Sequence, residues 1–493
     1  MSASVVEDKT MEEKTSEAQY IDELAKGGDG TPMVQYDAQE EKRTVKKLDL
    51  WLITMLMVIN LCSFLDRGNI GNAYSAGMGK DLGITSDKYA WLITIYFIAY
   101  ICFHWLILVW KLVSPPVFVM CAALGWGTVS MLQATATSFS TLMVCRFFLG
   151  VFEAAFAPGI PLFLSFYYNR REIGFRYGLF FSTSPLASCF ASAMAYGILH
   201  ARTALEGWQL LFVIEGAPTI ILALVAGYIL PKAPNKCRFL TPRENEIVAT
   251  RAIKGRGQEE EGKLNFKQVF AAFYDYKNYL GAVIIFCFNS SFNSLPAFLP
   301  TIVEDIGIGN KLTSQGLVAP PNLLAFIVCV AMSIMSDRMG TRGPFIAGLS
   351  LVGGIGYLLL ALIETPGVRY FCTFLILSGG VAASALTFVW VTDNQGSSSK
   401  RGAGLIIFGV LAQSGSILGA HLFPKTEAPR YVKSMAICAG LLFFGCILTV
   451  IFSICLRIQN KKRDEKYGKA DPKEVPSDIF DLGDRHPMYR YVV

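Results

Sequence analysis

The chain carries about twelve uninterrupted apolar runs, and most are roughly 20 residues long, the length that crosses a bilayer as a helix. Inside lipid, every backbone N–H and C=O must find its partner within the protein, so only helices or closed barrels span a membrane. Barrel strands alternate apolar and polar residues, whereas these runs do not. The pattern therefore predicts an all-α membrane protein with twelve transmembrane helices.

The predicted spans form two groups of six on either side of one long polar interior segment, residues 231–278. They lie at 48–66, 89–110, 115–134, 140–168, 175–199, 208–230, 279–300, 315–335, 344–363, 368–391, 402–423 and 434–456. Many secondary transporters consist of two such halves, which rock around a site at the membrane midplane. We therefore expect two pseudo-symmetric six-helix bundles, at 48–230 and 279–456. Residues 1–47 form a polar tail that is predicted to be disordered, and residues 457–493 form a second tail.

Basic residues lie mostly beside the spans and give the chain a net charge of +6. They precede the first span, follow the last one and occur in the even-numbered connections, whereas the 425–433 loop is a mild exception. Because an excess of Lys and Arg marks cytoplasmic segments, this distribution predicts that both tails lie in the cytoplasm. We expect a multi-pass protein of the plasma membrane whose charge reflects its orientation in the lipid bilayer. The same distribution argues against nucleic acid as a partner.

The 12 cysteines are scattered, nearly all within apolar runs, and none shows the spacing of metal ligands. We interpret them as small buried apolar residues. The sequence has no catalytic triad, phosphate-binding loop or metal motif, so neither an enzyme nor a cofactor is predicted. Transport is expected to be driven by an ion gradient rather than by ATP, and the protein is expected to be a monomer.

Two pairs of charged residues fall within or beside the predicted spans. A charge at the centre of a span costs about 2.5–3.5 kcal/mol on insertion scales, so such residues are functional candidates. Asp66 and Arg67 fall at or just past the end of the first span, where they either mark the water interface or line a site. Arg146 and Glu153 lie well inside the fourth span and project from one face, about 10 Å apart along the axis. They form either a structural ion pair with another helix or part of a functional site.

Charge balance suggests a mechanism for these four residues. Two arginines and two carboxylates in one cavity sum to zero, and an anionic substrate that pairs with Arg67 or Arg146 makes the cavity negative. A carboxylate that loses its Arg partner to the substrate takes up a proton more readily. Protonation of Glu153 or Asp66 then restores neutrality. The hypothesis is symport of a small organic anion with protons.

Polar residues in other spans complete the predicted substrate site. They are Tyr96 and Tyr100 in span two, Asn289 and Asn293 in span seven, and Gln413 in span eleven. Buried amides need hydrogen-bond partners, and a substrate is one possible partner. Aromatic packing explains the tyrosine pair equally well. In span six, Glu215 is interpreted as a partner for an arginine.

A charged turn joins spans eight and nine and reads SDRMGTRGPF. Its charges are Asp337, Arg338 and Arg342. Charges at this place can hold adjacent helices in one conformation, so we interpret the turn as a gating element rather than a binding site.

Several stretches, in this order and spacing, resemble the major facilitator superfamily. They are FLDRGNIGNA, RFFLGVFEAAFAPG, WQLLFVIEGAPT, FLTPRENEIV, SDRMGTRGP, NQGSSSKRGAG and KTEAPRY. Within the superfamily the chain is similar to the anion:cation symporter family and its fungal allantoate permease-like branch. The resemblance covers residues 45–460. It implies the major facilitator fold and inward transport of small organic acids or vitamins with protons. It also implies roles in coupling and anion binding for Asp66, Arg67, Arg146 and Glu153.

The chain departs from this family at the connection after span two. Relatives have a charged turn there, whereas this sequence reads VWKLVSPPVF, with no Asp and no paired Arg. The departure puts the inner gate of the first half in doubt. It also leaves open a transporter-like nutrient sensor that signals with little flux. A drug or metabolite exporter is a further alternative, but span five lacks the glycine-rich pattern of the exporting relatives.

Overall fold

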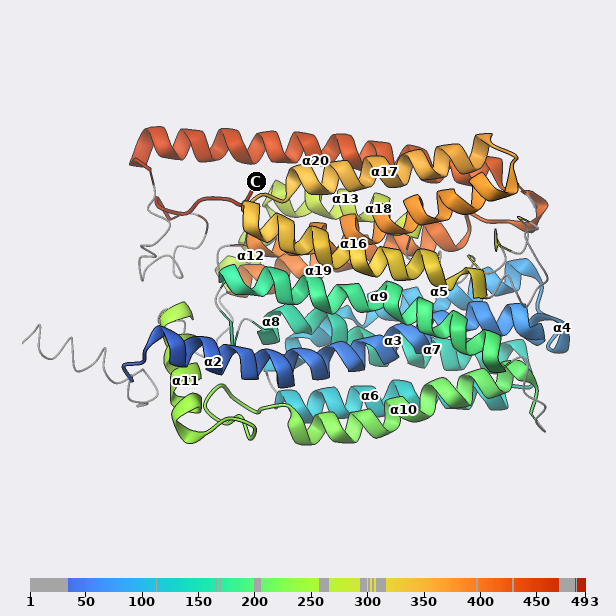
Figure 1. The fold of residues 1–493 in the computed structure, drawn as a ribbon, viewed down its shortest axis with the longest axis horizontal. Coiled ribbons are helices and arrows are strands. Elements are labelled where there is room, and N and C mark those ends of the chain that lie inside the picture. Colours follow the sequence, from blue (N-terminus) through green and yellow to red (C-terminus); the bar gives the residue numbers. More distant parts are fainter. Residues whose placement is uncertain are drawn as a thin grey trace, which may run out of the picture.

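The computed structural model describes most of the chain. The described residues are 34–111, 113–164, 166–168, 170–198, 205–256, 266–292, 316–395, 398–427, 430–469 and 486–493, with Leu299, Ile302, Val303, Ile306 and Asp484. Nearly all of them are helical, and Figure 1 shows long helices running side by side.

Twelve long helices form the bundle in the part of the chain that the structure describes. The first six are α3 (Thr54–Ala73), α5 (Ser86–Cys102), α6 (Pro115–Leu132), α7 (Phe139–Phe156), α9 (Arg170–Ile198) and α10 (Gly207–Ile229). The second six are α13 (Tyr276–Phe292), α16 (Ala319–Met339), α17 (Gly343–Leu362), α18 (Pro366–Asp393), α19 (Ser398–Ala420) and α20 (Val432–Tyr467). Within the described residues, ten helical stretches are long and apolar enough to cross a membrane. The 17-residue helices α5 and α13 complete two sets of six, which confirms the predicted fold class.

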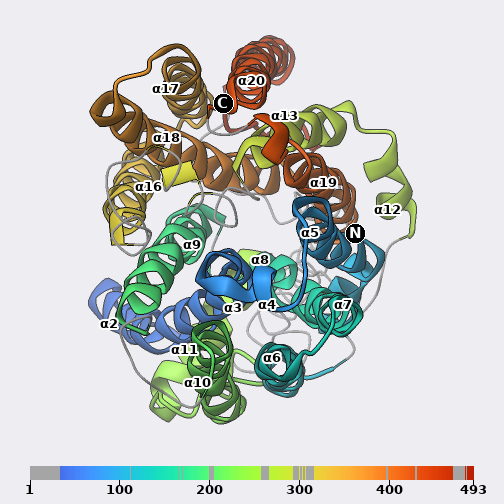
Figure 2. The same ribbon diagram turned by 90° about the vertical axis from the view of Figure 1, so that its right-hand side faces the viewer.

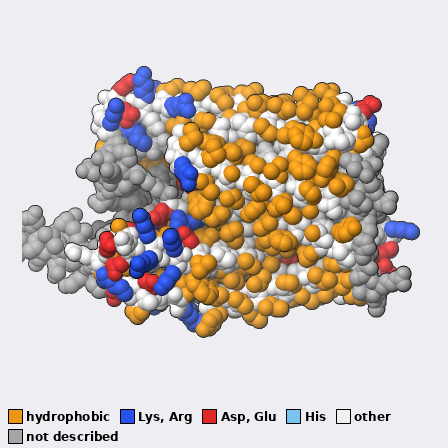
Figure 3. Space-filling model, in the orientation of Figure 1, with side chains coloured by type: hydrophobic (Ala, Val, Ile, Leu, Met, Phe, Trp, Pro, Cys, Tyr) orange, Lys and Arg blue, Asp and Glu red, His pale blue; other side chains and the backbone are white. Residues whose placement is uncertain are grey.

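The two sets of six form two halves, with α5 and α9 of the first half facing the second half (Figure 2). Contacts between the halves join α9 to α16 and α18, and α5 to α19. Large apolar side chains cover the middle of the outer surface, whereas charged side chains gather towards its ends (Figure 3). Leu224 and Ile447, for example, are 56% and 57% exposed. Such a band is stable only against hydrocarbon, so the chain is a multi-pass membrane protein.

The first long helix corrects two expectations. Residues 38–81 form a helical stretch that comprises α2 (Ala38–Leu48), α3 and shorter segments, with a kink at Gly77. The predicted disorder of residues 1–47 is therefore wrong for α2, which begins with a capping box at Asp37. The predicted end of the first span at residue 66 is also wrong, because α3 continues to Ala73. Asp66 consequently lies inside the bundle and not at its surface.

One end of the bundle carries α2, the central segment and residues 486–493, and we call it the terminal end; the other is the far end (Figure 1). The central segment contains α11 (Pro242–Arg256) and α12 (Phe266–Phe273). Thr241 caps the start of α11, because Thr241 and Glu244 exchange capping hydrogen bonds. Arg251 of α11 pairs with Glu41 and Glu172, each at 2.7 Å, and so holds the central segment against the first half.

Candidate functional site

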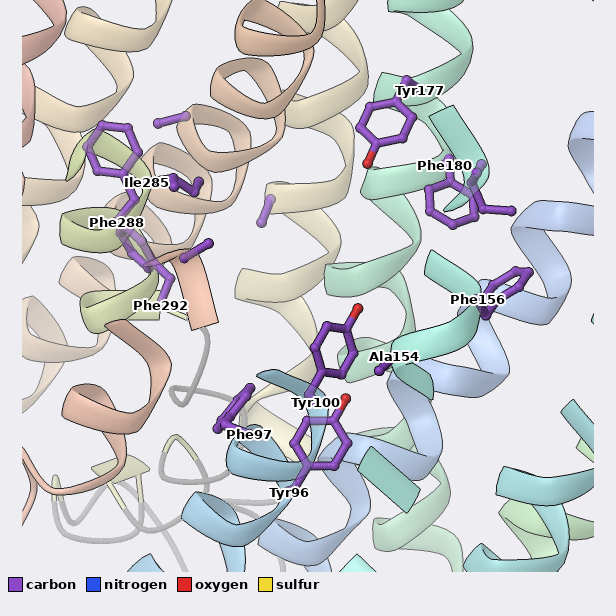
Figure 4. Packing of buried hydrophobic residues seen from close by; sticks show 14 of the residues in the cluster. Tyr96, Phe97, Tyr100, Ala154, Phe156, Tyr177, Phe180, Ile285, Phe288 and Phe292 are labelled. Carbon is purple, nitrogen blue, oxygen red and sulfur yellow. The ribbon is translucent and has the colours of Figure 1, made fainter. Parts of the chain in front are cut away.

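Arg67, which is partly buried, and Glu153, which is fully buried, form an ion pair between α3 and α7. Arg67 Nη2 lies 2.7 Å from Glu153 Oε2, and Arg67 Nε donates to the same oxygen at 3.1 Å. The Tyr96 hydroxyl on α5 donates a third hydrogen bond to Oε2, at 2.7 Å. The guanidinium also lies 5.1 Å and 5.7 Å from the ring centroids of Tyr96 and Tyr100, which lie side by side on α5 (Figure 4). Three helices thus position this ion pair, whose two residues sequence analysis had singled out separately.

Arg146 is the second buried guanidinium, and its side chain is not neutralised in the same way. The residue is 2% exposed, and Nη1 donates to the backbone carbonyl of Arg67 at 3.0 Å. Among the described residues, Nε and Nη2 have no hydrogen-bond partner. Arg146 and Glu153 are both buried on α7, as their spacing predicted, but no ion pair joins them to each other. Arg146 therefore keeps hydrogen-bond donors that can hold an anion. Arg67 and Arg146, together with Glu153, form what we call the arginine cluster.

Asp66 faces away from this cluster, although it directly precedes Arg67 in the sequence. Neighbouring residues on a helix project about 100° apart. The Asp66 carboxylate accepts hydrogen bonds from Ser130 Oγ on α6 at 2.6 Å and from Thr219 Oγ1 on α10 at 2.9 Å. The prediction that all four charged residues line one cavity is therefore wrong for both carboxylates: Glu153 meets the cavity only through its ion pair with Arg67, and Asp66 does not meet it at all. Helical rotation, which adjacency in sequence conceals, separates Asp66 from the other three.

A cavity lies between the two halves beside the arginine cluster. From the first half it is lined by Phe64, Arg67, Gly68, Ile70, Ile93, Tyr96, Phe97, Arg146, Phe181, Ser184, Pro185 and Ser188. From the second half it is lined by Asn289, Phe292, Asn322, Leu377, Val381 and Ser384. The first half thus contributes both cations, whereas the second contributes amides, a hydroxyl and apolar side chains. Such a surface suits a small molecule with one charged group and an apolar body.

The neutral candidates divide into those that line this cavity and those that do not. Tyr96 and Asn289 line it, and Asn289 Nδ2 also donates to the carbonyl of Ala412 at 3.1 Å. Tyr100 contacts Arg67 without lining the cavity, and Gln413 accepts a hydrogen bond from Ser416 elsewhere on α19. The prediction for Asn293 lies outside the described residues.

Sequence analysis missed Asn322 and Ser384 in the cavity wall. Their only signal is the general one of a polar residue within an apolar run. The chain offers many such residues, so this signal alone does not select these two.

A charged cluster joins helices of the second half at the terminal end. Arg342 lies 2.7 Å from Asp337 and 2.8 Å from Asp393, at the end of α18. Burial alone would lower the pKa of Arg342, but these two carboxylates raise it above its ordinary value. Two of the three predicted gating residues therefore meet. Arg338 is exposed and forms no ion pair with any described residue.

This charged cluster also meets the first half. A Cβ atom at Gly174 of α9 would lie 2.3 Å from Arg342 Nη2, so α9 packs directly against the guanidinium. Farther along the same helix, Tyr177 stacks on Phe388 of α18, with ring centroids 4.9 Å apart. Phe181, which lines the cavity, also lies against Phe388 at 5.3 Å. These contacts close the space between the halves at the terminal end.

The last described residues dock beside the same cluster. The Val493 carbonyl accepts a hydrogen bond from the backbone N–H of Arg342 at 2.6 Å, and the Val492 carbonyl accepts one from Trp390 Nε1 at 2.8 Å. Asp484 lies 3.0 Å from Lys277 and 2.7 Å from Lys400. Burial alone would raise the pKa of Asp484, but the two ammonium groups lower it to about 2.

In the connection after α5, where the sequence departs from the family pattern, the indole ring of Trp110 packs against the end of α7. The chain continues as the short helix η3 (His104–Lys111), and Trp110 Nε1 donates to the carbonyl of Ala155 at 2.8 Å. A Cβ atom at Gly159 would lie 2.0 Å from Trp110 Nε1, so only glycine permits this approach. Trp110 thus packs where α7 ends. At this connection the first half has the apolar contact of Trp110 with one hydrogen bond, whereas the second half has the ion pairs of Arg342. The Trp110 contact needs no charged partner, so this connection requires neither an Asp nor a paired Arg.

At the far end, α5 and α19 of the two halves also meet. Thr94 Oγ1 lies 2.9 Å from His421 Nε2. The ring of Trp91 contacts the same imidazole edge-on, with centroids 5.7 Å apart. The cavity therefore lies between contacts at both ends. Within the described ranges, no group of three or more His, Cys, Asp or Glu residues is arranged to hold a metal ion.

Comparisons with known proteins agree with this architecture. The sequence model of the Major Facilitator Superfamily matches residues 56–420. A Schizosaccharomyces pombe protein described as an uncharacterized transporter is 30% identical, over 99% of this chain and 98% of its own length. The major facilitator-type transporter hxnP of Emericella nidulans is 30% identical, over 94% and 95%. The high-affinity nicotinic acid transporter of Saccharomyces cerevisiae is 28% identical, over 94% and 87%.

Solved structures show the same fold at low sequence identity. The proton:xylose symporter XylE, bound to 6-bromo-6-deoxy-D-glucose, superposes with a TM-score of 0.62 at 12% identity and covers 81% of this chain and 95% of its own. A bacterial homologue of the human lysosomal transporter Spinster gives a TM-score of 0.58 at 14% identity, over 82% and 96%.

Proposed function

Because the chain belongs to the major facilitator superfamily and is a membrane transporter of a small molecule, we propose that it imports a small organic anion together with protons. The observation that carries this proposal is the state of Arg146. Its guanidinium lines the cavity between the halves, and two of its nitrogen atoms have no hydrogen-bond partner among the described residues. A buried cation with unused donors is a recognition group for an anion.

The charges around the cavity support an anion rather than a neutral substrate. Glu153 neutralises Arg67, whereas Asp66 lies behind the cavity wall, so Arg146 leaves the cavity with a net positive charge. An uncompensated charge inside a membrane protein is costly. A carboxylate substrate placed against Arg146 would remove this cost and would gain about 1.5–3 kcal/mol from each hydrogen bond to the charged group.

Glu153 is the proposed point of contact between substrate and proton. Oε2 accepts the hydrogen bonds from Arg67 and Tyr96, whereas Oε1 has no partner among the described residues and is the atom open to a proton. When a substrate anion beside Arg146 also attracts Arg67, Glu153 loses part of its stabilisation. Protonation at Oε1 then restores electrical neutrality. Asp66 is the second proposed proton-coupling carboxyl group.

The two closures support alternating access. At the terminal end, Tyr177 of the first half stacks on Phe388 of the second, beside the ion pair between Arg342 and Asp393, and at the far end Thr94 meets His421. Transport requires these contacts to open in turn, while the Arg146 site stays between them. The basic residues that flank the spans favour a cytoplasmic terminal end, and the proposed location is the plasma membrane.

The cavity wall and the relatives together suggest the substrate class. Phe64, Tyr96 and Phe292 provide aromatic surface beside Arg146, and Asn289 adds an amide. One relative is named a high-affinity nicotinic acid transporter. We therefore propose an aromatic or small vitamin-like monocarboxylate, which also agrees with the resemblance to the anion:cation symporter family. Nicotinate is the first probe to test.

Uptake into proteoliposomes tests the proposal. With an acidic exterior and the membrane potential clamped, the chain should accumulate labelled nicotinate or a related carboxylate, and Arg146→Ala should lose this accumulation. Arg457→Ala, which changes an exposed arginine on α20 that does not line the cavity, is the matched control. Accumulation without a pH gradient, or binding without flux as in a nutrient sensor, would contradict proton symport. Outward movement driven by proton entry would instead identify an exporter.

A further inference from the structure

The last described residues cross the terminal end of the second half. Asp484 and residues 486–493 make up this segment, which we call the strap and which lies beside the letter C in Figure 1. Its hydrogen bonds reach α13, α18, α19 and α20, and also the residue that caps the start of α17. Helix ends of the second half are therefore joined by a segment that lies outside all of these helices.

Two asparagine side chains bind the backbone of the strap as a neighbouring β-strand would. Asn460 of α20 donates from Nδ2 to the carbonyl of Tyr491 at 2.8 Å, and its Oδ1 accepts from the N–H of the same residue at 2.9 Å. Asn394, the residue after α18, forms the same two hydrogen bonds with Val492, at 3.0 and 2.8 Å. Each amide thus pairs with both polar groups of one strap residue, which is how an extended peptide is recognised through its main chain.

Two tyrosines of the strap add specificity to this main-chain recognition. Tyr489 and Tyr491 are 2% and 6% exposed, and their rings pack edge-on, with centroids 5.2 Å apart. The Tyr489 hydroxyl donates to the carbonyl of Asp393 at 3.2 Å, and the Tyr491 hydroxyl accepts from Lys277 Nζ at 2.9 Å. In bound extended peptides, main-chain hydrogen bonds provide affinity and alternate side chains provide specificity. The site therefore suits a peptide with two tyrosines that are two positions apart.

The strap also bonds to both residues of an ion pair at the terminal end. The N–H of Arg342 donates to the carbonyl of Val493 at 2.6 Å. The carbonyl of Asp393 accepts the hydrogen bond from Tyr489. The side chains of Arg342 and Asp393 pair at 2.8 Å, and the guanidinium packs against Gly174 of the first half. The strap thus fixes the backbone from which this ion pair projects towards the first half.

We propose that the terminal end of the second half is a peptide-binding site, and that its bound peptide, the strap, stabilises the closed terminal end. While the strap is bound, the ion pair of Arg342 and Asp393 is held where its guanidinium meets α9. Release of the strap frees this ion pair, so the population shifts towards the state that is open at the terminal end. The lining of the cavity includes no residue of the strap, so the strap acts on the opening of the cavity and not on its contents.

The rate at which a cysteine in the cavity wall is labelled from the terminal side measures this closure. Ser384→Cys provides the cysteine in the full chain, and an impermeant maleimide is added to sealed vesicles that expose the terminal end. Mass spectrometry reads the label at residue 384 alone, because Cys102 and Cys121 are also exposed.

Release of the strap by substitution should open the terminal end. Tyr489→Ala combined with Tyr491→Ala, which we call the tyrosine variant, should accelerate labelling about tenfold. A synthetic peptide of residues 484–493, DRHPMYRYVV, added outside the vesicles should restore the slow rate. The same peptide with both alanine substitutions should not restore it. Tyr467→Ala, which changes an exposed tyrosine of α20, is the matched control and should leave the rate unaltered.

A change in the site itself separates loss of the bound peptide from loss of the site. Asn460→Leu removes both main-chain hydrogen bonds to Tyr491 and keeps a side chain of similar volume, so labelling should accelerate about tenfold. At the concentration that restores the tyrosine variant, the peptide should not reverse this acceleration. If the tyrosine variant fails to fold, Tyr489→Phe, which removes only the hydrogen bond to Asp393, should still accelerate labelling about fivefold.

Each outcome decides for or against the peptide-binding site. An unaltered labelling rate in the tyrosine variant, even with a lower melting temperature, would show that the strap does not hold the closure and would overturn the proposal. Acceleration that the peptide fails to reverse would indicate general damage and would overturn it as well. Reversal in Asn460→Leu as complete as in the tyrosine variant would show that Asn460 does not bind the strap. These measurements use no substrate, so they test this site separately from the proposed import of an anion.

Discussion

The two halves of the bundle share an architecture but carry their buried charges in different places. In the first half, Arg67, Arg146 and Glu153 lie beside the cavity, with Asp66 and Glu215 behind it. In the described helices of the second half, buried charges lie at helix ends, and the cavity wall is formed by neutral side chains. The comparison teaches that pseudo-symmetry need not divide the chemistry equally. The first half carries the groups that we propose bind the anion and the protons, whereas the second carries a charged cluster at the terminal end.

The corresponding connections of the two halves at the terminal end also differ in where they carry charge. The α16–α17 connection closes through Arg342, Asp337 and Asp393, whereas the α5–α6 connection closes through Trp110 and a single hydrogen bond. Each set of contacts lies within its own half and holds the helix ends that face the other half, through charges in the second half and mainly through apolar surface in the first. We therefore expect the second half to contribute most of the polar energy of this closure.

The largest effect should follow removal of the cavity cation. Arg146→Ala removes the only guanidinium of the cavity that no described carboxylate pairs with, so anion affinity should fall about 100-fold or more. Arg146→Lys keeps the charge without the planar donors and should lose less. Binding of labelled nicotinate to purified protein measures the change, with Arg457→Ala as the control. Equal nicotinate affinity in all variants would show that Arg146 does not bind the anion, and would contradict the proposal that anion binding belongs to the first half.

A smaller effect should follow a change in the charged closure. In Asp393→Asn, Arg342 keeps Asp337 but loses one of its two carboxylate partners, so the closed terminal end should become less stable by about 1.5–3 kcal/mol. Labelling of a cysteine introduced into the cavity wall at Ser384, from the terminal side, should accelerate by about 10- to 100-fold, with substrate affinity altered much less. An unaltered labelling rate would show that these ion pairs do not hold the closure.

The matching change in the first half should be weaker. Trp110→Phe keeps an aromatic ring against Gly159 but removes the hydrogen bond to Ala155, at a cost of about 1 kcal/mol. The same labelling measurement should then accelerate less than in Asp393→Asn. A larger acceleration in Trp110→Phe would reverse the ranking of the two closures.

The smallest effect concerns pH at the terminal end. The pKa of Asp484 is about 2, below its ordinary value, because of Lys277 and Lys400. Its contribution to stability is therefore complete above the pKa of the unfolded chain and is lost only as the pH falls towards 2. Asp484→Asn should lower the melting temperature by the same amount throughout about pH 5–8. A decrement that varies across this range would show that the cluster of Asp484, Lys277 and Lys400 titrates between about pH 5 and 8 and would contradict the lowered pKa of Asp484.

Sequence reasoning predicted the bundle well because hydrophobic runs report directly on membrane burial. The predicted ninth span, 344–363, differs by one residue at each end from α17. The spacing of Arg146 and Glu153 likewise predicted a shared buried face. These features depend only on local composition and helical periodicity.

The missed features depend on relations between distant segments. Asp66 and Arg67 face different helices because of the rotation of α3, which adjacency in sequence does not reveal. Asp484 meets Lys277 from 207 residues away, and no local pattern announces this contact. Asp393 was overlooked because a charge at the end of an apolar run usually marks only the membrane interface.

Counting the protons taken up when an anion binds tests the central claim most directly. Calorimetric titration of the purified protein with nicotinate, in buffers of different ionisation enthalpy, gives this number. In Glu153→Gln, Arg67 loses its counter-ion and the anion should still bind, but the number of protons taken up should fall by about one. Glu206→Gln, an exposed change at the start of α10, should leave it unaltered. An unaltered proton number in Glu153→Gln would contradict the assignment of anion–proton coupling to the charged cluster of the first half.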